Sequence, residues 1–161
     1  MTRGLRAAAG AVLALAAGAA PAGEHDEVLA RINAYRAAGA RCGAETMPAV
    51  PPLTWNEALE RAAALQAQHM ARGDGVTHTG ADGSNVSQRV SAQGYEWGRV
   101  GENVAAGRSS ASATLAQWMA SPGHCRNLMG AQFEVVALAR QERPGTTYRH
   151  YWVMVLAAPL R

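Results

Sequence analysis

Three polar segments of this chain carry side chains that could bind a metal ion or take part in catalysis. They read Val76-Thr77-His78-Thr79-Gly80, Gly101-Glu102-Asn103-Val104-Ala105 and Ser121-Pro122-Gly123-His124. Two imidazoles and a carboxylate could hold Zn²⁺ or another divalent cation and leave a fourth position open. Alternatively, Glu102 could orient a histidine or activate a water molecule. The sequence motifs of α/β-hydrolases, zincins, P-loop proteins and dinucleotide-binding proteins are absent.

The chain has two cysteines, Cys42 and Cys125. An even number of cysteines in an oxidising compartment favours a disulfide bond. This bond would close a loop of roughly eighty residues and stabilise the fold by about 4–5 kcal/mol in the chain-entropy model. The alternative is two free thiols, with Cys125 beside His124 as a nucleophile. Because adjacent side chains rarely point at each other, we expect the disulfide.

The N-terminal segment has the pattern of a secretory signal peptide. Two arginines come first, an apolar run of roughly fourteen residues follows, and a small-x-small cleavage site ends at Ala22. The apolar run is too short to span a bilayer of about 30 Å. We therefore expect residues 1–22 to be removed and residues 23–161 to form one exported domain, secreted or periplasmic.

The charge balance argues against nucleic acid as a partner. The 161-residue chain has fifteen basic residues, all arginine, against twelve acidic ones, a formal net charge of +3. The arginines are scattered, whereas a phosphate-binding surface needs a stripe or patch of positive charge. Removal of the signal peptide takes away two arginines and no acid, which lowers the net charge to +1. No later segment reads as a transmembrane helix.

Apolar periodicity and capping signals predict the elements that position the first polar segment. A helix is expected over residues 24–41, and a capping box of Thr54 and Glu57 predicts the start of a second. The irregular stretch 74–100 follows, with one helical turn near 86–92. A connection of that length in a compact domain is usually functional or mobile.

The C-terminal half is expected to add a strand, two helices and a hairpin. Residues 102–106 could form a short strand, and a serine pair at 109–110 caps a helix that ends at Ser121. Ser121 can also start a further short helix, since a proline follows it. Residues 133–139 and 148–156 are β-rich around a Pro-Gly turn, which predicts an antiparallel hairpin. Helices segregated from a small antiparallel sheet indicate an α+β fold.

Three polar residues outside these segments receive structural interpretations. Arg36 and Arg89 are expected to donate hydrogen bonds to loop carbonyls or acids. His25 lies next to the cleavage site and is expected to be disordered.

Five ordered blocks of sequence span nearly the whole exported chain. They are Asn33-x-x-Arg36 with Leu53-x-Trp55-x-x-x-Leu59; His78-Thr79-Gly80-Ala81-Asp82-Gly83-Ser84, followed by Arg89 and Gly94-Tyr95; Gly101-Glu102-Asn103-Val104-Ala105; Trp118-Met119-x-Ser121-Pro122-Gly123-His124-x-x-Asn127-Leu128-Met129; and Tyr151-Trp152-Val153. Over residues 32–159 these blocks resemble the CAP superfamily of cysteine-rich secretory, antigen 5 and pathogenesis-related 1 proteins, in its compact bacterial form.

The resemblance implies a three-layer α-β-α sandwich around a small central antiparallel sheet, with a cleft lined by histidines and acids. By position, His78, Glu102 and His124 match three of the family's four cleft residues. The fourth, an acid that animal members carry on the helix before the second histidine, is missing here. The cleft is further expected to be lined by Asn103, Ser121 and Trp97.

Two functions remain open for such a cleft. In the first, a non-enzymatic exported module binds a divalent cation such as Zn²⁺ or a small ligand, and its surface binds a lipid, a cell-wall polymer or a protein. In the second, His78, Glu102 and His124 hydrolyse a peptide or an ester, with a metal ion or with Glu102 orienting a histidine base. The missing second acid and the lack of an evident nucleophile favour the binding module, which we expect to be a monomer.

Overall fold

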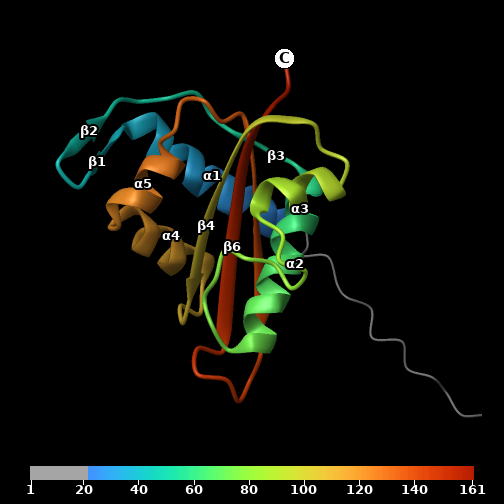
Figure 1. The fold of residues 1–161 in the computed structure, drawn as a ribbon. Helices are drawn as coiled ribbons and strands as arrows, with labels where there is room; N and C mark the ends of the chain where they lie inside the picture. The colour runs from blue at the N-terminus through green and yellow to red at the C-terminus, as the bar shows by residue number, and fades with distance from the viewer. Residues whose placement is uncertain (1–21) are drawn as a thin grey trace, which may run out of the picture.

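A four-stranded sheet separates two layers of helices in the structure, a computed structural model that describes residues 22–161 (Figure 1). The strands lie in the order β3 (Thr54–Trp55), β5 (Val135–Glu142), β6 (His150–Pro159) and β4 (Trp97–Ala106). The β3–β5 pair is parallel and the other two pairs are antiparallel. The predicted hairpin of the last two strands is therefore confirmed, and β4 is an edge strand.

Each face of the sheet buries its own apolar core against a helical layer. On one face α2 (Glu57–Gly73) and α3 (Val86–Ala92) cover the sheet. On the other face the cover is α1 (Ala22–Ala38), α4 (Ala111–Met119) and α5 (Pro122–Leu128). This arrangement confirms the α+β, three-layer α-β-α prediction. The predicted signal peptide, residues 1–22, lies outside the described residues except for Ala22.

Local sequence explains where the helices begin and end. The side chain of Asn56 accepts hydrogen bonds from the first turn of α2, so Asn56 is the N-cap and the predicted capping box of Thr54 and Glu57 is wrong. Thr54 instead lies in β3, where it pairs with Val135 of β5. Helix α1 ends before residue 39, where Gly39 adopts a φ of +71°.

A small hairpin and a disulfide bond hold α5 in place. Strands β1 (Ala40–Cys42) and β2 (Glu45–Met47) form a two-stranded sheet that the sequence pattern did not reveal. Cys42 in β1 is bonded to Cys125 in α5, with their Cα atoms 5.4 Å apart. The predicted disulfide is confirmed, and it fixes the residue next to His124.

Strand β4 begins five residues before the predicted strand, at Trp97. The two glycines in residues 97–101 lower β-propensity, but pairing with β6 overrides that local preference. The register shifts once, between Trp97 and Arg99. Gly101 is required for packing, because a Cβ atom there would lie 2.8 Å from the ring of Phe133.

Asp74 links the end of α2 to the β5–β6 hairpin. It caps α2 in the left-handed conformation, with a φ of 49°. Its carboxylate accepts hydrogen bonds from the Tyr151 hydroxyl at 2.5 Å and from the Thr147 amide at 2.9 Å. These hydrogen bonds lower the pKa of Asp74, the Tyr151 hydroxyl contributing most.

The start of α1 is tied to α2 through His25. The imidazole stacks on Trp55 with ring centroids 4.4 Å apart, and its Nε2 lies 3.1 Å from Glu60 Oε1. The expected disorder of His25 is therefore wrong. Among residues 22–161, no helix combines the length and the apolar character that a membrane crossing needs.

Candidate functional site

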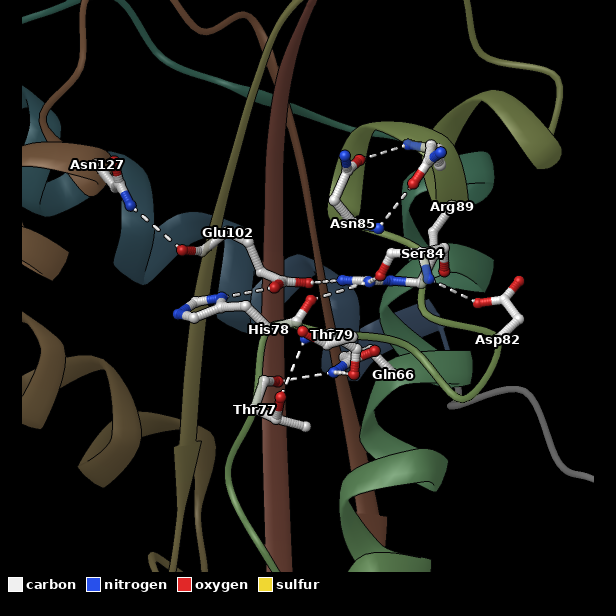
Figure 2. A network of polar contacts seen from close by, with 11 residues as sticks. Gln66, Thr77, His78, Thr79, Asp82, Ser84, Asn85, Arg89, Glu102 and Asn127 are labelled. Atoms are coloured by element: carbon white, nitrogen blue, oxygen red, sulfur yellow. Dashed lines mark hydrogen bonds and ion pairs between the residues drawn. The ribbon is translucent and has the colours of Figure 1, made fainter.

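Glu102 lies at the centre of the polar site, on the edge strand β4. Its side chain is only 2% exposed, and both carboxylate oxygens are used. Oε1 lies 2.7 Å from His78 Nδ1, and Oε2 forms an ion pair with Arg89. Figure 2 shows the carboxylate between the His78 ring and the Arg89 guanidinium. Because a carboxylate only accepts hydrogen bonds, the shared proton of the first contact belongs to His78 Nδ1.

The loop that carries His78 is fastened to both helices of its layer. Gln66 of α2 donates from Nε2 to the carbonyls of Thr77 (2.7 Å) and Thr79 (3.1 Å), on either side of the histidine. Arg89 of α3 donates to the carbonyl of His78 at 3.1 Å. Hydrogen bonds to three successive carbonyls, those of residues 77–79, thus fix the loop backbone. The His78 side chain remains 62% exposed.

His124 belongs to the opposite layer, in the first turn of α5. Ser121, the N-cap of that helix, makes no capping hydrogen bond with its side chain. Its hydroxyl lies 2.9 Å from His124 Nδ1 instead. The backbone around His124 is fixed twice, by the disulfide at Cys125 and by Asn103, which donates to the His124 carbonyl at 3.1 Å.

An asparagine pair joins the second histidine to the edge strand. Asn127 of α5 donates to Asn103 Oδ1 at 2.8 Å and to the Glu102 carbonyl at 3.3 Å. Since Asn103 also binds the carbonyl of His124, the turn carrying His124 and the strand carrying Glu102 form one hydrogen-bonded unit.

The two imidazoles are close enough to influence each other electrostatically. Burial lowers the pKa of His124 below its usual value, and the charge of His78 lowers it further. A neutral imidazole is the form that binds metal ions, so His124 keeps that form at lower pH than a solvated histidine. The two predicted histidines thus lie on opposite layers, each hydrogen-bonded to a neighbouring residue of β4.

Glu102 takes an orienting role in this arrangement. Within residues 22–161, no three His, Cys, Asp or Glu side chains are grouped as ligands for one metal ion. The carboxylate oxygens of Glu102 are already bound to His78 and Arg89. Of the two roles that the sequence left open, the contacts favour holding the His78 ring over direct coordination.

The remaining predicted cleft residues separate into two groups. Asn103 and Ser121 contact the backbone and the ring of His124. Trp97 lies at the far end of β4, where its indole donates to Ser91 Oγ at 2.9 Å. It is five residues from Glu102 along the strand, or about 17 Å at the usual rise per residue. Trp97 thus belongs with α3, away from the histidines.

Motif spacing alone does not reveal the roles of Gln66 and Arg89. Both are buried and neither belongs to the three polar segments. A signal for Gln66 exists, because it occupies the buried face of α2 together with Leu59, Ala63 and Met70. A polar residue on an apolar helix face must bond to something buried. The expectation that Arg89 binds loop carbonyls or an acid is confirmed, since it binds both.

A hollow of about 460 Å³ lies behind the His78 loop, between α2 and α3. Its walls include Leu65, Arg72, Asp82, Gln88 and Arg89. Neither His78 nor His124 lines it. The two histidines therefore lie outside this hollow, at the sheet edge.

Fold and site define an α-β-α sandwich protein with two oriented histidines at the edge of its sheet. The sequence profile of the cysteine-rich secretory protein family, CAP, matches residues 29–156. The chain belongs to this family. A search of curated protein sequences found no match.

Solved structures with the same fold come from bacteria and a parasite. An extracellular protein of Bacillus anthracis with an SCP domain is 20% identical, with a TM-score of 0.68 over 84% of this chain. This chain covers 40% of the Bacillus protein. An outer surface protein of Borrelia burgdorferi is 18% identical, with a TM-score of 0.64 over 84% of this chain and 89% of that protein. The venom allergen-like protein 4 of Schistosoma mansoni is 12% identical, with a TM-score of 0.54 over 86% and 90%.

Proposed function

We propose that this protein is an extracytoplasmic binding module whose two histidines hold a divalent cation such as Zn²⁺. One observation carries the proposal. His78 and His124 both use Nδ1 for a side-chain hydrogen bond, to Glu102 and to Ser121. Among the contacts of residues 22–161, neither Nε2 has a hydrogen-bond partner. An imidazole fixed through Nδ1 with a free Nε2 is the usual arrangement of a metal-binding histidine.

Two further features support an exported binding role. The disulfide between Cys42 and Cys125 suits an oxidising compartment. The similar proteins of Bacillus and Borrelia are described as extracellular and outer surface proteins. Together with the signal-peptide pattern, these features favour a secreted or periplasmic location. Water or a small polar ligand would complete the coordination of a cation held by two histidines.

Calorimetric titration of the purified protein with Zn²⁺ tests the proposal. His78→Ala and His124→Ala should each weaken binding about fivefold or more, which corresponds to about 1 kcal/mol. His69→Ala is the matched control, because His69 lies on α2 outside the site, and its affinity should equal that of the wild type. Absence of Zn²⁺ binding by the wild type, or wild-type affinity in both site variants, would refute the shared cation site.

A hydrolase acting in the same cleft is the second candidate. The Ser121 hydroxyl lies 2.9 Å from His124 Nδ1, which is the distance of a nucleophile from its base. Burial lowers the pKa of the His124 ring, which favours the neutral form that can accept a proton. A library of peptides and esters, screened with the wild type beside Ser121→Ala and Glu102→Ala, separates the two functions. Turnover by the wild type that disappears in either variant would favour the hydrolase over the binding module.

A further inference from the structure

Arg89 contacts both the backbone of the His78 loop and the carboxylate of Glu102. The side chain reaches the site from α3 and is buried, with 6% of its side chain exposed. One guanidinium nitrogen pairs with Glu102 Oε2. The other donates to the carbonyls of His78 at 3.1 Å and of Ser84 at 3.0 Å. A single planar group thus holds the carboxylate that contacts the histidine ring and the backbone that carries the ring (Figure 2).

We propose that Arg89 is a positioning residue that sets the tautomer of His78 and so leaves its Nε2 lone pair free for a ligand. The ion pair occupies Glu102 Oε2 with a cation and leaves Oε1 to face His78 Nδ1 at 2.7 Å. An oxygen of a paired carboxylate accepts a hydrogen bond and cannot donate one. His78 must therefore carry its proton on Nδ1, which leaves Nε2 as an acceptor or metal ligand.

Two comparisons within the chain separate this role from ordinary structural bonding. Arg36 is also buried, but its guanidinium binds only the carbonyls of Pro51, Leu128 and Gly130. Gln66 holds the backbone on both sides of His78 without touching the carboxylate. Arg89 alone among these three joins the loop backbone to the acid that contacts the imidazole.

The tautomer of His78 can be measured without any metal. Two-dimensional NMR can correlate the nitrogens of an imidazole ring with its carbon-bound protons. Near pH 8, where ordinary imidazoles are neutral, these spectra distinguish the protonated from the unprotonated nitrogen. The wild type should show His78 protonated on Nδ1. Arg89→Gln removes the partner that holds Glu102 Oε2, so Oε1 is no longer held opposite His78 Nδ1 and the population should shift toward the form protonated on Nε2. Arg89→Lys keeps a cation beside Glu102 and should restore much of the wild-type population.

Removing a cation beside a buried carboxylate can unfold the protein, so a second variant is needed. Arg89→Gln combined with Glu102→Gln removes both charges and leaves a neutral amide, which can donate as well as accept. The doubly substituted protein should fold and show a mixture of His78 tautomers. Arg61→Gln, which alters an exposed arginine of α2, should leave the tautomer unchanged.

Zn²⁺ titration then links the tautomer to the proposed function on which this role rests. Arg89→Gln should weaken Zn²⁺ binding about tenfold, as loss of a group that orients a ligand typically does. A wild-type His78 protonated on Nε2, or an unchanged tautomer in the folded single or double variant, would overturn the role of Arg89. If Arg89→Gln shifts the tautomer as expected but the wild type binds no Zn²⁺, the role of Arg89 is upheld and the cation site is refuted.

Discussion

Removing the disulfide bond should cost this protein a large part of its stability. The bond joins Cys42 to Cys125 across a sequence separation of 83 residues. The chain-entropy model gives a loss of about 4.5 kcal/mol at 25 °C for a loop of that length. The free energy of unfolding of a domain of ordinary size is about 5–15 kcal/mol, so this bond accounts for about 30% of it or more. Both cysteines are buried, which makes alanine the least disruptive replacement.

Urea unfolding of the wild type and of a double variant, each with and without a reducing agent, measures the effect and its source. Cys42→Ala with Cys125→Ala should lose about 4–6 kcal/mol, from the lost cross-link and the small cavities that remain. Wild-type protein under a reducing agent keeps its sulfur atoms and should lose only the cross-link contribution, about 4.5 kcal/mol. The reducing agent should not change the stability of the double variant. A reduced wild type within about 1 kcal/mol of the oxidised protein would refute the entropic reasoning.

Two further predictions concern contacts that tie the helices to the rest of the fold. The Tyr151 hydroxyl lowers the pKa of Asp74, so the ionised carboxylate stabilises the fold above about pH 4, and this contribution disappears as the pH falls through the lowered pKa. Asp74→Asn should therefore be less stable than the wild type at pH 6, and the difference should shrink by pH 2 in urea unfolding; a constant difference would contradict this. His25→Ala removes the stack on Trp55 and should cost about 1 kcal/mol in thermal unfolding, whereas His69→Ala should cost nothing measurable; equal effects would contradict the role of the stack.

Elements with strong local signals could be predicted from the sequence. The turn of helix at 86–92 coincides with α3, and Ser110 caps α4 as the serine pair indicated. Local signals failed where tertiary contacts override them. Thr54 matches a capping box but belongs to a strand, because Val135 lies beside it in the sheet. The small β1–β2 hairpin depends on the disulfide and on neighbours distant in sequence, neither of which leaves a periodic pattern.

The residue types of the site could be predicted from the sequence, but the role of each residue could not. His78, Glu102 and His124 could be selected because their side chains suit a metal or catalytic site and their positions match the cleft residues of the family that the sequence resembles. Glu102 orients the His78 ring with one carboxylate oxygen while Arg89 occupies the other. Arg89 lies thirteen residues earlier in the sequence, on a different element. No rule of sequence spacing predicts the contact between Arg89 and Glu102. A buried arginine in a short helix indicates only that some buried acceptor must exist.

The alternation of side chains along an edge strand explains how histidines from opposite layers are both tied to β4. Neighbouring residues of a strand point to opposite faces of the sheet. Val104 packs against α2, whereas Ala105 packs in the core beneath α1 and α4. By the same alternation Glu102 points toward the α2 layer, where it binds His78, and Asn103 points toward α5, where it binds the His124 backbone. In an inner strand these two faces would be separated by the adjoining strand. On β4, which has a strand on one side only, loops from both layers can reach around the edge. A substitution that slipped the β4–β6 register by one residue would exchange the two side chains and remove both supports at once.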